Sequence, residues 1–274
     1  MLDCYDIIVI GGGAAAASAV LTAKNRGKSI AVITNGEETS SLFKAERITN
    51  YPGLPPMSGS EMTALFRRQI EENADVVIRG RALNVLPMDE SFGVAVGNDF
   101  YQCRSLIIAA GITREKLYPG ESEYLGRGVS YCATCDGMLY RGKTVAVIGN
   151  GREAEEDAAF LESIGCRVIR LRENGRYEIK GGVKANCVLF RGEEYAVDGV
   201  FIIKDTVSVT RLVPGLSYKN GGIVTERDMS TNVPGVFAAG DCTGKPYQLA
   251  KAVGEGNIAA LSACDYLSRV SAFA

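Results

Sequence analysis

A glycine-rich turn between a strand-like and a helix-like segment constrains the fold of this chain most. The sequence GGGAAAASAVLTAKNRG follows a continuous apolar run at 5–10, and its alanine-rich body predicts a helix over 14–25. Another apolar run at 29–34 completes a strand–helix–strand unit. In such a unit the glycines let the backbone approach a pyrophosphate, and the helix start supplies amides and a positive dipole. This turn therefore predicts a dinucleotide site at Gly11, Gly13, Ala14 and Ala16.

The same pattern returns later in the chain. Residues 143–171 read as a strand, a glycine turn, a helix and a strand, with Gly149-x-Gly151-x-x-Ala154 at the turn. The segment 172–213 shows only short strands and turns, without a good helix. Further helices are predicted over 60–74 and 248–270, and a buried strand over 105–111. Strands that alternate with helices predict an α/β fold with two nucleotide-binding, Rossmann-like domains.

Composition and charge argue against several classes of function. The chain has 274 residues, and its net charge of −2 gives no reason to expect a nucleic-acid partner. No apolar run reaches the length of a membrane-spanning helix, and the start of the chain lacks the basic region of a secretory leader. Eight cysteines scattered through such a chain indicate reduced thiols and a cytoplasmic location rather than a disulfide scaffold.

The segment YCATCDG holds the residues with the most distinctive chemistry. The CxxC spacing of Cys132 and Cys135 suits a redox-active disulfide, a metal site or two inert buried thiols. A structural zinc site needs about four cysteine or histidine ligands, and the chain has no second CxxC and no histidine. We therefore predict a redox pair and no metal. Without histidine, Asp136 is the candidate proton donor to a leaving thiolate, and a solvated turn aspartate is the plain alternative.

The other six cysteines are isolated, and each lies in or beside an apolar run. Free cysteine usually behaves as a small hydrophobic residue. We therefore predict buried, unreactive side chains for Cys4, Cys103, Cys166, Cys187, Cys242 and Cys264.

Several motifs follow one another in an order that resembles the low-molecular-weight thioredoxin reductases. After the first glycine motif come TNYPG, GRGVSYCATCDG, the second glycine motif, VPGVFAAGDC and YQLAKAVGEGNIAA. The resemblance covers nearly the whole chain, and CATCDG and GVFAAGD are its most specific parts. It implies an FAD-binding domain, 1–112 and 214–274, interrupted by a shortened redox-disulfide domain, 113–213, that resembles a degenerate NADPH-binding domain. It also implies thioredoxin as a partner and a homodimer.

The resemblance assigns roles to residues that match the family's motifs. It implies that Cys132 attacks the disulfide of thioredoxin and that Cys135 faces the flavin. The first glycine motif and Glu37 would bind the adenosine half of FAD. Further along, Asn50 would lie near the flavin, Asp241 at the ribityl–phosphate region and Gln248 at the edge of the flavin ring. The implied FAD contacts in these later motifs are Asn50, Gly240, Asp241, Gln248 and Leu249.

The chain departs from the family pattern where a second nucleotide would bind. Typical members hold the 2′-phosphate of NADPH with the arginines of a His-Arg-Arg-x-x-x-Arg motif. Counted without gaps, those arginine positions fall on Glu173, Asn174 and Glu178, although a shift of two residues restores some positive charge. The helical stretch after the motif is missing, and Asp205 replaces a glycine beside the nicotinamide site. This pattern is similar to that of the ferredoxin-dependent flavin thioredoxin reductases, which do not use pyridine nucleotides.

These departures predict ferredoxin as the electron donor and a purely structural role for the second glycine motif. A basic patch, which an acidic ferredoxin would suit, lies within 166–191, although an ordinary solvated face has the same composition. The favoured function is a flavoprotein disulfide reductase that passes electrons from ferredoxin through FAD and Cys132–Cys135 to thioredoxin. An NADPH-dependent enzyme with an atypical cofactor site and a non-catalytic flavoprotein redox sensor are the alternatives. The patch consists of Arg167, Arg170, Arg172, Arg176, Lys180, Lys184 and Arg191.

Overall fold

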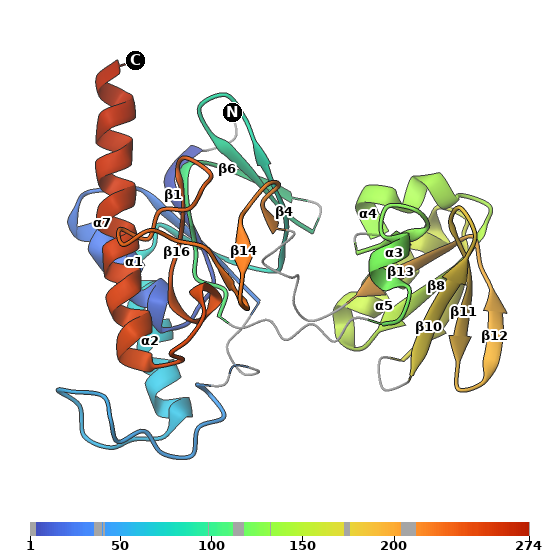
Figure 1. The fold of residues 1–274 in the computed structure, drawn as a ribbon, viewed down its shortest axis with the longest axis horizontal. Helices are drawn as coiled ribbons and strands as arrows, with labels where there is room; N and C mark the ends of the chain where they lie inside the picture. Colours follow the sequence, from blue (N-terminus) through green and yellow to red (C-terminus); the bar gives the residue numbers. More distant parts are fainter. Residues whose placement is uncertain are drawn as a thin grey trace. The chain divides into compact units, whose positions relative to one another are not determined.

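The structure, a computed structural model, divides the chain into two compact units (Figure 1). The outer unit comprises Met1–Thr113 and Val207–Ala274, and the inner unit comprises Arg114–Thr206. The structure describes residues 4–35, 40, 42–97, 99–111, 118–131, 133–172, 176–203 and 212–273. For residues 122, 134–135, 151–153 and 271–273 it describes the backbone alone.

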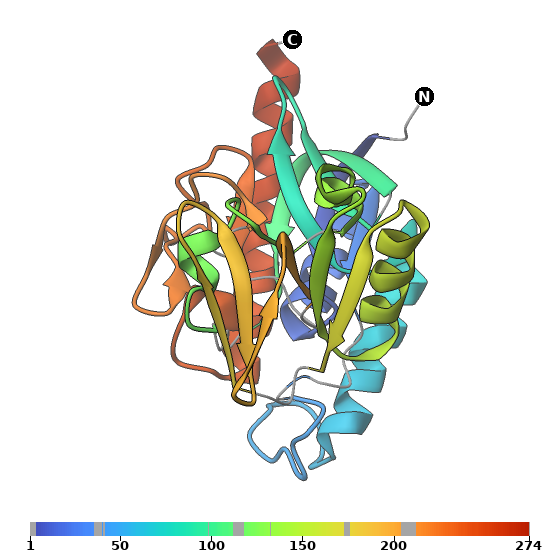
Figure 2. The same ribbon diagram turned by 90° about the vertical axis from the view of Figure 1, so that its right-hand side faces the viewer.

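A parallel four-stranded sheet forms the centre of the inner unit, in the order β7–β13–β8–β9. One face, with Val145 and Phe201, packs against helix α5, and the other face packs against the antiparallel strands β10, β11 and β12 (Figure 2). The strands are β7 (Val129–Ser130), β8 (Thr144–Gly149), β9 (Arg167–Leu171), β10 (Tyr177–Gly181), β11 (Ala185–Phe190), β12 (Glu193–Ala196) and β13 (Gly199–Ile203). The helical elements are α3 (Glu121–Tyr124), α4 (Ala133–Asp136), the 3₁₀ turn η1 (Gly137–Tyr140) and α5 (Gly151–Ser163).

The inner unit confirms the strand, turn, helix and strand predicted over 143–171. Beyond β9, the described residues up to Ile203 form strands only, as the sequence predicts. The sheet of the inner unit is therefore covered by α5 on one face and, among the described residues, by β10–β12 and the short helix α3 on the other.

A seven-stranded mixed sheet forms the centre of the outer unit, in the order β3–β2–β1–β6–β5–β4, with β16 also paired to β6. Strands β1, β2, β3, β6 and β16 pair in parallel, while β5 pairs antiparallel with both β6 and β4. The bounds are β1 (Cys4–Ile10), β2 (Ile30–Thr34), β3 (Val76–Arg79), β4 (Ala82–Pro87), β5 (Phe92–Val96), β6 (Asp99–Ile108) and β16 (Val236–Ala238). A small hairpin of β14 (Tyr218–Lys219) and β15 (Gly222–Ile223) lies outside this sheet.

Strand β6 begins earlier and ends earlier than the predicted strand at 105–111. Its first part, 99–103, pairs antiparallel with β5, and its last part, 106–108, pairs parallel with β16. The first part includes Asp99 and Gln102, because an antiparallel hairpin tolerates polar residues on its solvent side. Only the second part is a continuous apolar run, so the predicted strand covers that part alone.

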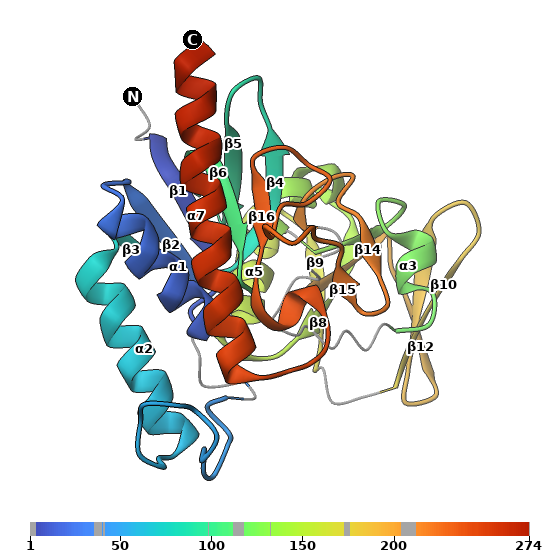
Figure 3. The same cartoon turned by 60° about the vertical axis from the view of Figure 1, so that its left-hand side comes forward.

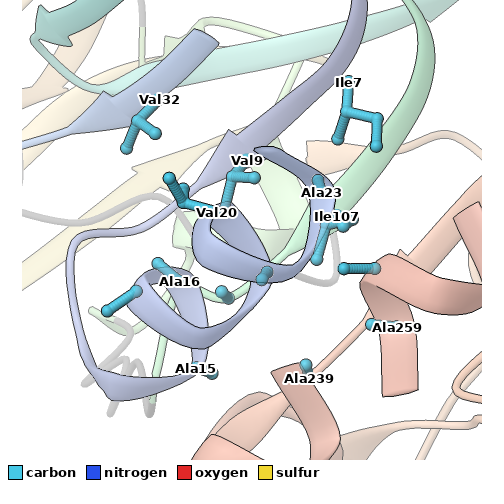
Figure 4. Packing of buried hydrophobic residues seen from close by; sticks show 14 of the residues in the cluster. Ile7, Val9, Ala15, Ala16, Val20, Ala23, Val32, Ile107, Ala239 and Ala259 are labelled. Atoms are coloured by element: carbon cyan, nitrogen blue, oxygen red, sulfur yellow. The ribbon is translucent and has the colours of Figure 1, made fainter. Parts of the chain in front are cut away.

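Three helices cover one face of the outer sheet: α1 (Ala14–Asn25), α2 (Gly59–Asn73) and α7 (Leu249–Phe273) (Figure 3). They confirm the helices predicted over 14–25, 60–74 and 248–270. Alanines of α1 lie between the sheet and α7, close to Val9, Ile107 and Ala259 (Figure 4). Such small residues let the backbones approach closely: a Cβ on Gly256 would lie 2.2 Å from the carbonyl oxygen of Ala15. The start of α1 is therefore held against both β1 and α7.

Candidate functional site

Two glycines shape the turn before α1, and one of them, Gly11, could not be replaced by a larger residue without rearrangement. Gly11 has φ +128°, and a Cβ there would lie 2.1 Å from the carbonyl oxygen of Ala109. Gly13 caps α1 without a side-chain hydrogen bond, and nothing lies within 4 Å of its Cβ position. The first turn of the helix contains no acidic residue. Because the first amides of a helix lack intrahelical partners, this open, positively polarised end fits a pyrophosphate.

The turn after β16 lies beside the same helix end. Gly240 begins the 3₁₀ turn η2 (Gly240–Thr243) with φ +86°, and its Cβ position is 3.0 Å from Cβ of Ala15. Burial raises the pKa of the half-buried Asp241, while Lys251 lowers it and Glu255 raises it. The structure therefore brings Gly240, from the VPGVFAAGDC motif, together with the start of the helix after the first glycine motif.

Asn50 and Gln248 meet although they are far apart in sequence. The Asn50 side-chain amide donates to Oε1 of Gln248 at 3.2 Å, and both side chains are exposed. Leu249, the first residue of α7, instead packs against the hydrophobic core between the helices and the sheet. Glu37, the predicted ribose contact, lies outside the described residues. Within the outer unit, the predicted flavin neighbours Asn50 and Gln248 thus share one contact.

The redox motif lies at the start of two short helical turns in the inner unit. Cys132 lies outside the described residues, and Cys135 belongs to α4, where only its backbone is described. A Cβ on Gly137 would lie 3.0–3.2 Å from side chains of α5 and the residues after it, so the turn packs tightly there. Ala133 is fully buried in the same cluster. Ala133 and Gly137, on either side of Cys135 in the chain, are therefore closely packed.

Asp136 has a hydrogen-bond partner that the motif alone does not reveal. The Ser130 hydroxyl, on the short strand β7, donates to Oδ2 of Asp136 at 2.6 Å. A hydroxyl can donate to a carboxylate or accept from a carboxylic acid, so this contact suits Asp136 in both protonation states. Ser130 could have been identified from the sequence as a polar residue on a strand just before the CxxC motif.

A buried carboxylate lies next to the redox motif as well. Glu121 is fully buried and accepts from the Tyr131 hydroxyl and from the amide of Tyr118, both at 2.8 Å. Tyr131 directly precedes Cys132 in the chain. Sequence reasoning missed Glu121 because α3, which it begins, is a single four-residue turn and too short to show a periodic pattern.

Two exposed apolar side chains follow the motif directly. Met138 is 58% exposed and Leu139 is 69% exposed. Large apolar side chains exposed side by side near a reactive group are typical of a protein-binding surface. This turn is therefore a candidate protein-binding surface.

The basic patch predicted within 166–191 is partly neutralised. Arg170 pairs with Glu155 at 3.3 Å and with Glu162 at 2.6 Å, and both glutamates belong to α5. Lys180 lies 3.8 Å from Glu178 and 3.7 Å from Glu194. Three of these four carboxylates belong to α5 and β12, outside 166–191, so the sequence of that segment does not reveal them. Among the exposed basic residues for which the structure shows no such pair are Arg172, Arg176 and Lys184.

The prediction that the other cysteines are buried is wrong at two positions. Cys4 is exposed and Cys187 is half-buried, because β1 and β11 present these residues at less covered places. The remaining four are buried, and burial raises the pKa of both Cys103 and Cys242 to about 12. Thiols with such pKa values are poor nucleophiles near neutral pH.

The described part of the chain holds neither a metal-binding cluster nor a membrane-spanning helix. No cluster of acidic residues, cysteines or histidines that could hold a metal ion occurs there. Nor is any helix within those ranges long and apolar enough to span a bilayer.

Comparisons with known proteins agree with this arrangement. The profile of the pyridine nucleotide-disulphide oxidoreductase family matches residues 5–179 and 170–256. A thioredoxin reductase from Treponema pallidum (strain Nichols) is 33% identical, with 96% of this chain and 97% of the relative covered.

Solved structures of related enzymes have the same fold. A ferredoxin-flavin thioredoxin reductase from Clostridium acetobutylicum superposes with a TM-score of 0.88 at 36% identity, over 97% of this chain and 98% of its own. A thioredoxin reductase from Gloeobacter violaceus gives a TM-score of 0.78 at 30% identity, over 97% of this chain and 94% of its own. The chain therefore belongs to the pyridine nucleotide-disulphide oxidoreductases and, within them, to the thioredoxin reductases, which are FAD-binding flavoproteins.

Proposed function

We propose that this thioredoxin reductase receives its electrons from reduced ferredoxin rather than from NADPH. One observation carries the proposal: where the family resemblance predicts an arginine for the 2′-phosphate, Glu178 lies in β10, 3.8 Å from Lys180. A carboxylate repels a phosphate, and Lys180 is already shared between Glu178 and Glu194. The related ferredoxin-flavin enzyme from Clostridium acetobutylicum supports the same donor. Glu173, Asn174 and Asp205 lie outside the described residues.

The second glycine motif supports the proposal through its packing. A Cβ on Gly149 would lie 2.6 Å from the carbonyl oxygen of Ile203 and 2.9 Å from Cβ of Ala154. Gly149 is thus required where β8, β13 and α5 meet, whatever binds nearby. The motif can be kept for packing after nucleotide binding is lost.

In the proposed site, the outer unit holds FAD and the inner unit carries the reactive cysteines. The adenosine and pyrophosphate would be bound at the start of α1, and Asp241 would hold the ribityl–phosphate region. When bound, FAD accepts electrons one at a time and delivers them in pairs. That property suits a one-electron donor and a two-electron disulfide. The proposed cofactor contacts are Gly11, Gly13, Ala14, Ala16, Glu37, Asn50, Gly240, Asp241, Gln248 and Leu249.

Thiol–disulfide exchange would follow once two electrons have opened the Cys132–Cys135 bond. The Cys132 thiolate attacks one sulfur of the thioredoxin disulfide, which forms a mixed disulfide and releases the other thioredoxin sulfur as a thiolate. Asp136 donates a proton to that thiolate. The Cys135 thiolate then attacks Cys132, which restores the enzyme disulfide and releases the second thioredoxin sulfur. That sulfur also leaves as a thiolate and takes its proton from solvent, so thioredoxin has gained two electrons, one proton from Asp136 and one proton from water.

The redox potentials permit this direction of transfer. A plant-type ferredoxin has a potential near −400 mV, and thioredoxin has a potential near −270 mV. The difference of about 130 mV corresponds to roughly 6 kcal/mol for two electrons. Electron flow from ferredoxin to thioredoxin is therefore strongly downhill.

Anaerobic reduction of the bound flavin by each donor tests the proposal. We expect reduced ferredoxin to bleach the flavin absorbance and to support thioredoxin reduction. Millimolar NADPH or NADH should leave the flavin oxidised, because we expect no cluster of positively charged side chains that binds a 2′-phosphate in the inner unit. Fast bleaching by NADPH, at the rate of turnover, would identify a conventional NADPH-dependent enzyme. Bleaching without reduction of any disulfide protein would indicate a flavoprotein redox sensor.

Charge reversal tests where ferredoxin docks. Changing Arg172, Arg176 and Lys184 to glutamate should slow flavin reduction by ferredoxin about tenfold at low salt, because steering by exposed charges raises association rates. The effect should shrink as salt rises, since exposed charges are screened within about 10 Å at 0.1 M. Stopped-flow absorbance gives the rates.

A matched triple variant controls for net charge. Changing the exposed residues Lys219, Arg227 and Arg269 of the outer unit to glutamate alters the net charge equally. We expect a smaller effect on the rate with this variant. Equal slowing by both triple variants would place docking elsewhere and leave the donor assignment intact.

We further propose that the enzyme is a cytoplasmic homodimer, as the family resemblance implies. Sedimentation equilibrium should then give about twice the chain mass of 29.2 kDa. A mass of one chain at micromolar concentration would contradict the dimer.

A further inference from the structure

A lysine of α7 holds the turn that presents Asp241. The Lys251 ammonium donates to the carbonyl oxygens of Gly240 at 2.9 Å and Gly244 at 2.8 Å, and to the hydroxyl of Thr243 at 2.8 Å. These partners span the whole of η2 and the glycine after it. One side chain therefore fixes both ends of the turn relative to the first residues of α7.

A glutamate one helical turn later completes the arrangement. Oε2 of Glu255 accepts from the amide of Gly240 at 2.9 Å, from the Thr243 hydroxyl at 3.0 Å and from Lys251 at 3.1 Å. Both charged side chains are only 16% exposed. Charged groups this far from solvent cost free energy unless paired, and each hydrogen bond to them is strong.

Another ion pair with the same i,i+4 spacing, in helix α2, is far more exposed. Arg68 and Glu72 of α2 are also four residues apart and lie 2.7 Å from each other, but their side chains are 76% and 54% exposed. An exposed pair of this kind contributes little to the stability of a helix. Lys251 and Glu255, in contrast, bind several atoms of the turn as well as each other. Their main role is therefore to hold the turn, and helix stability is secondary.

The position of the turn connects it with the start of α1. Gly240 lies against Ala15 and Ala252, so α1, the turn and α7 meet at this glycine. Asp241 is half-buried, burial raises its pKa, and Lys251 lowers that pKa. The ammonium of Lys251 thus favours the charged form of the Asp241 carboxyl, while the nearby Glu255 carboxylate disfavours it.

We propose that Lys251 and Glu255 are positioning residues that hold the Gly240–Gly244 turn ready for FAD and thereby set its affinity. The proposal rests on the proposed placement of the pyrophosphate at α1 and of Asp241 beside the ribityl–phosphate region. The hydrogen bonds of both side chains go to backbone atoms of the turn and to the Thr243 hydroxyl. The pair therefore affects FAD by positioning the turn. FAD thus meets a turn that is already in place.

Release of FAD from the holoenzyme on dilution, followed by flavin fluorescence, tests the proposal. Lys251→Met should raise the dissociation constant for FAD about 10²-fold, because two carbonyls and a buried carboxylate lose their partner. If this variant does not fold, Glu255→Gln provides the test, with an expected rise of about tenfold. An unchanged dissociation constant in the variant that folds would overturn the proposal.

The reversed pair Lys251→Glu/Glu255→Lys separates turn positioning from simple ion pairing. It keeps an i,i+4 ion pair, but it places a carboxylate against the carbonyls of Gly240 and Gly244. We expect FAD affinity to stay as low as in Lys251→Met, and recovery of wild-type affinity would overturn the proposal.

The reversed exposed pair Arg68→Glu/Glu72→Arg is the matched control, and it should bind FAD like wild type. Weakened binding in this control would show that pair reversal alone lowers affinity, which would remove the support from the reversed buried pair. A wild-type protein without bound FAD would contradict the FAD site itself rather than the role of the lysine.

Discussion

Cys135→Ser is expected to capture thioredoxin as a stable mixed disulfide through Cys132. Cys132 can still attack the substrate disulfide, but no second thiol remains to release the product. Turnover should fall by about 10⁴-fold or more, since the resolving step has lost its nucleophile. The trapped complex is measured by non-reducing electrophoresis and by mass spectrometry of the linked peptides. The variant needs reduced Cys132, so thioredoxin disulfide is added after treatment with a reductant.

Cys132→Ser is the matched variant and should behave differently. It should form no mixed disulfide, because the attacking sulfur is absent. If Cys135 faces the flavin, its thiolate should produce a long-wavelength charge-transfer band with oxidised FAD. A mixed disulfide that forms through Cys135 in this variant, but not through Cys132 in the other, would reverse the two roles.

Asp136→Asn is expected to slow disulfide exchange by about 10²-fold or more, the usual size of a general-acid contribution. The amide keeps the shape of the side chain and can still accept from the Ser130 hydroxyl, so the fold and FAD binding should persist. It has no proton to give to the leaving thiolate, and the chain contains no histidine to replace it. The rate is measured in a single turnover with pre-reduced enzyme and thioredoxin, which excludes the electron donor from the measurement.

Ser130→Ala shows how far Asp136 depends on its neighbour. Loss of the 2.6 Å hydrogen bond should slow exchange about tenfold, the equivalent of one hydrogen bond to a charged group. This effect should disappear in the Asp136→Asn background if both residues serve one step. Full activity of Asp136→Asn would reduce Asp136 to a turn residue.

Local sequence patterns predicted the helices and the central parallel strands well. The alanine-rich body of α1 and its glycine end fixed that helix at both boundaries, since Gly27 takes a φ of +66° that ends it. Prediction of β6 was poorer because one strand combines a buried parallel part with a half-exposed antiparallel part. The two parts follow different patterns of polarity, and a single rule recognises only one of them.

The functional sites show a similar division. Motifs identified Asn50 and Gln248 separately, and the structure joins them by a hydrogen bond across nearly two hundred residues of chain. Lys251, Glu255, Ser130 and Glu121 were not predicted, because their importance depends on partners that only the folded chain supplies. The basic patch was overestimated for the same reason: Glu155, Glu162 and Glu194 lie outside the counted segment but next to its charges.

One edge of β6 is shared between two strands that the ribosome makes at very different times. β5 precedes β6 directly, whereas β16 follows only after the whole inner unit has been synthesised. Until then residues 106–108 of β6 have an unpaired edge on that side, which is a place where a nascent chain can associate wrongly. The inner unit is made in one continuous stretch and can fold during this interval. Gly240, Lys251 and Glu255 emerge later still, so the turn proposed to receive FAD is complete only after the cysteine-bearing unit has been made.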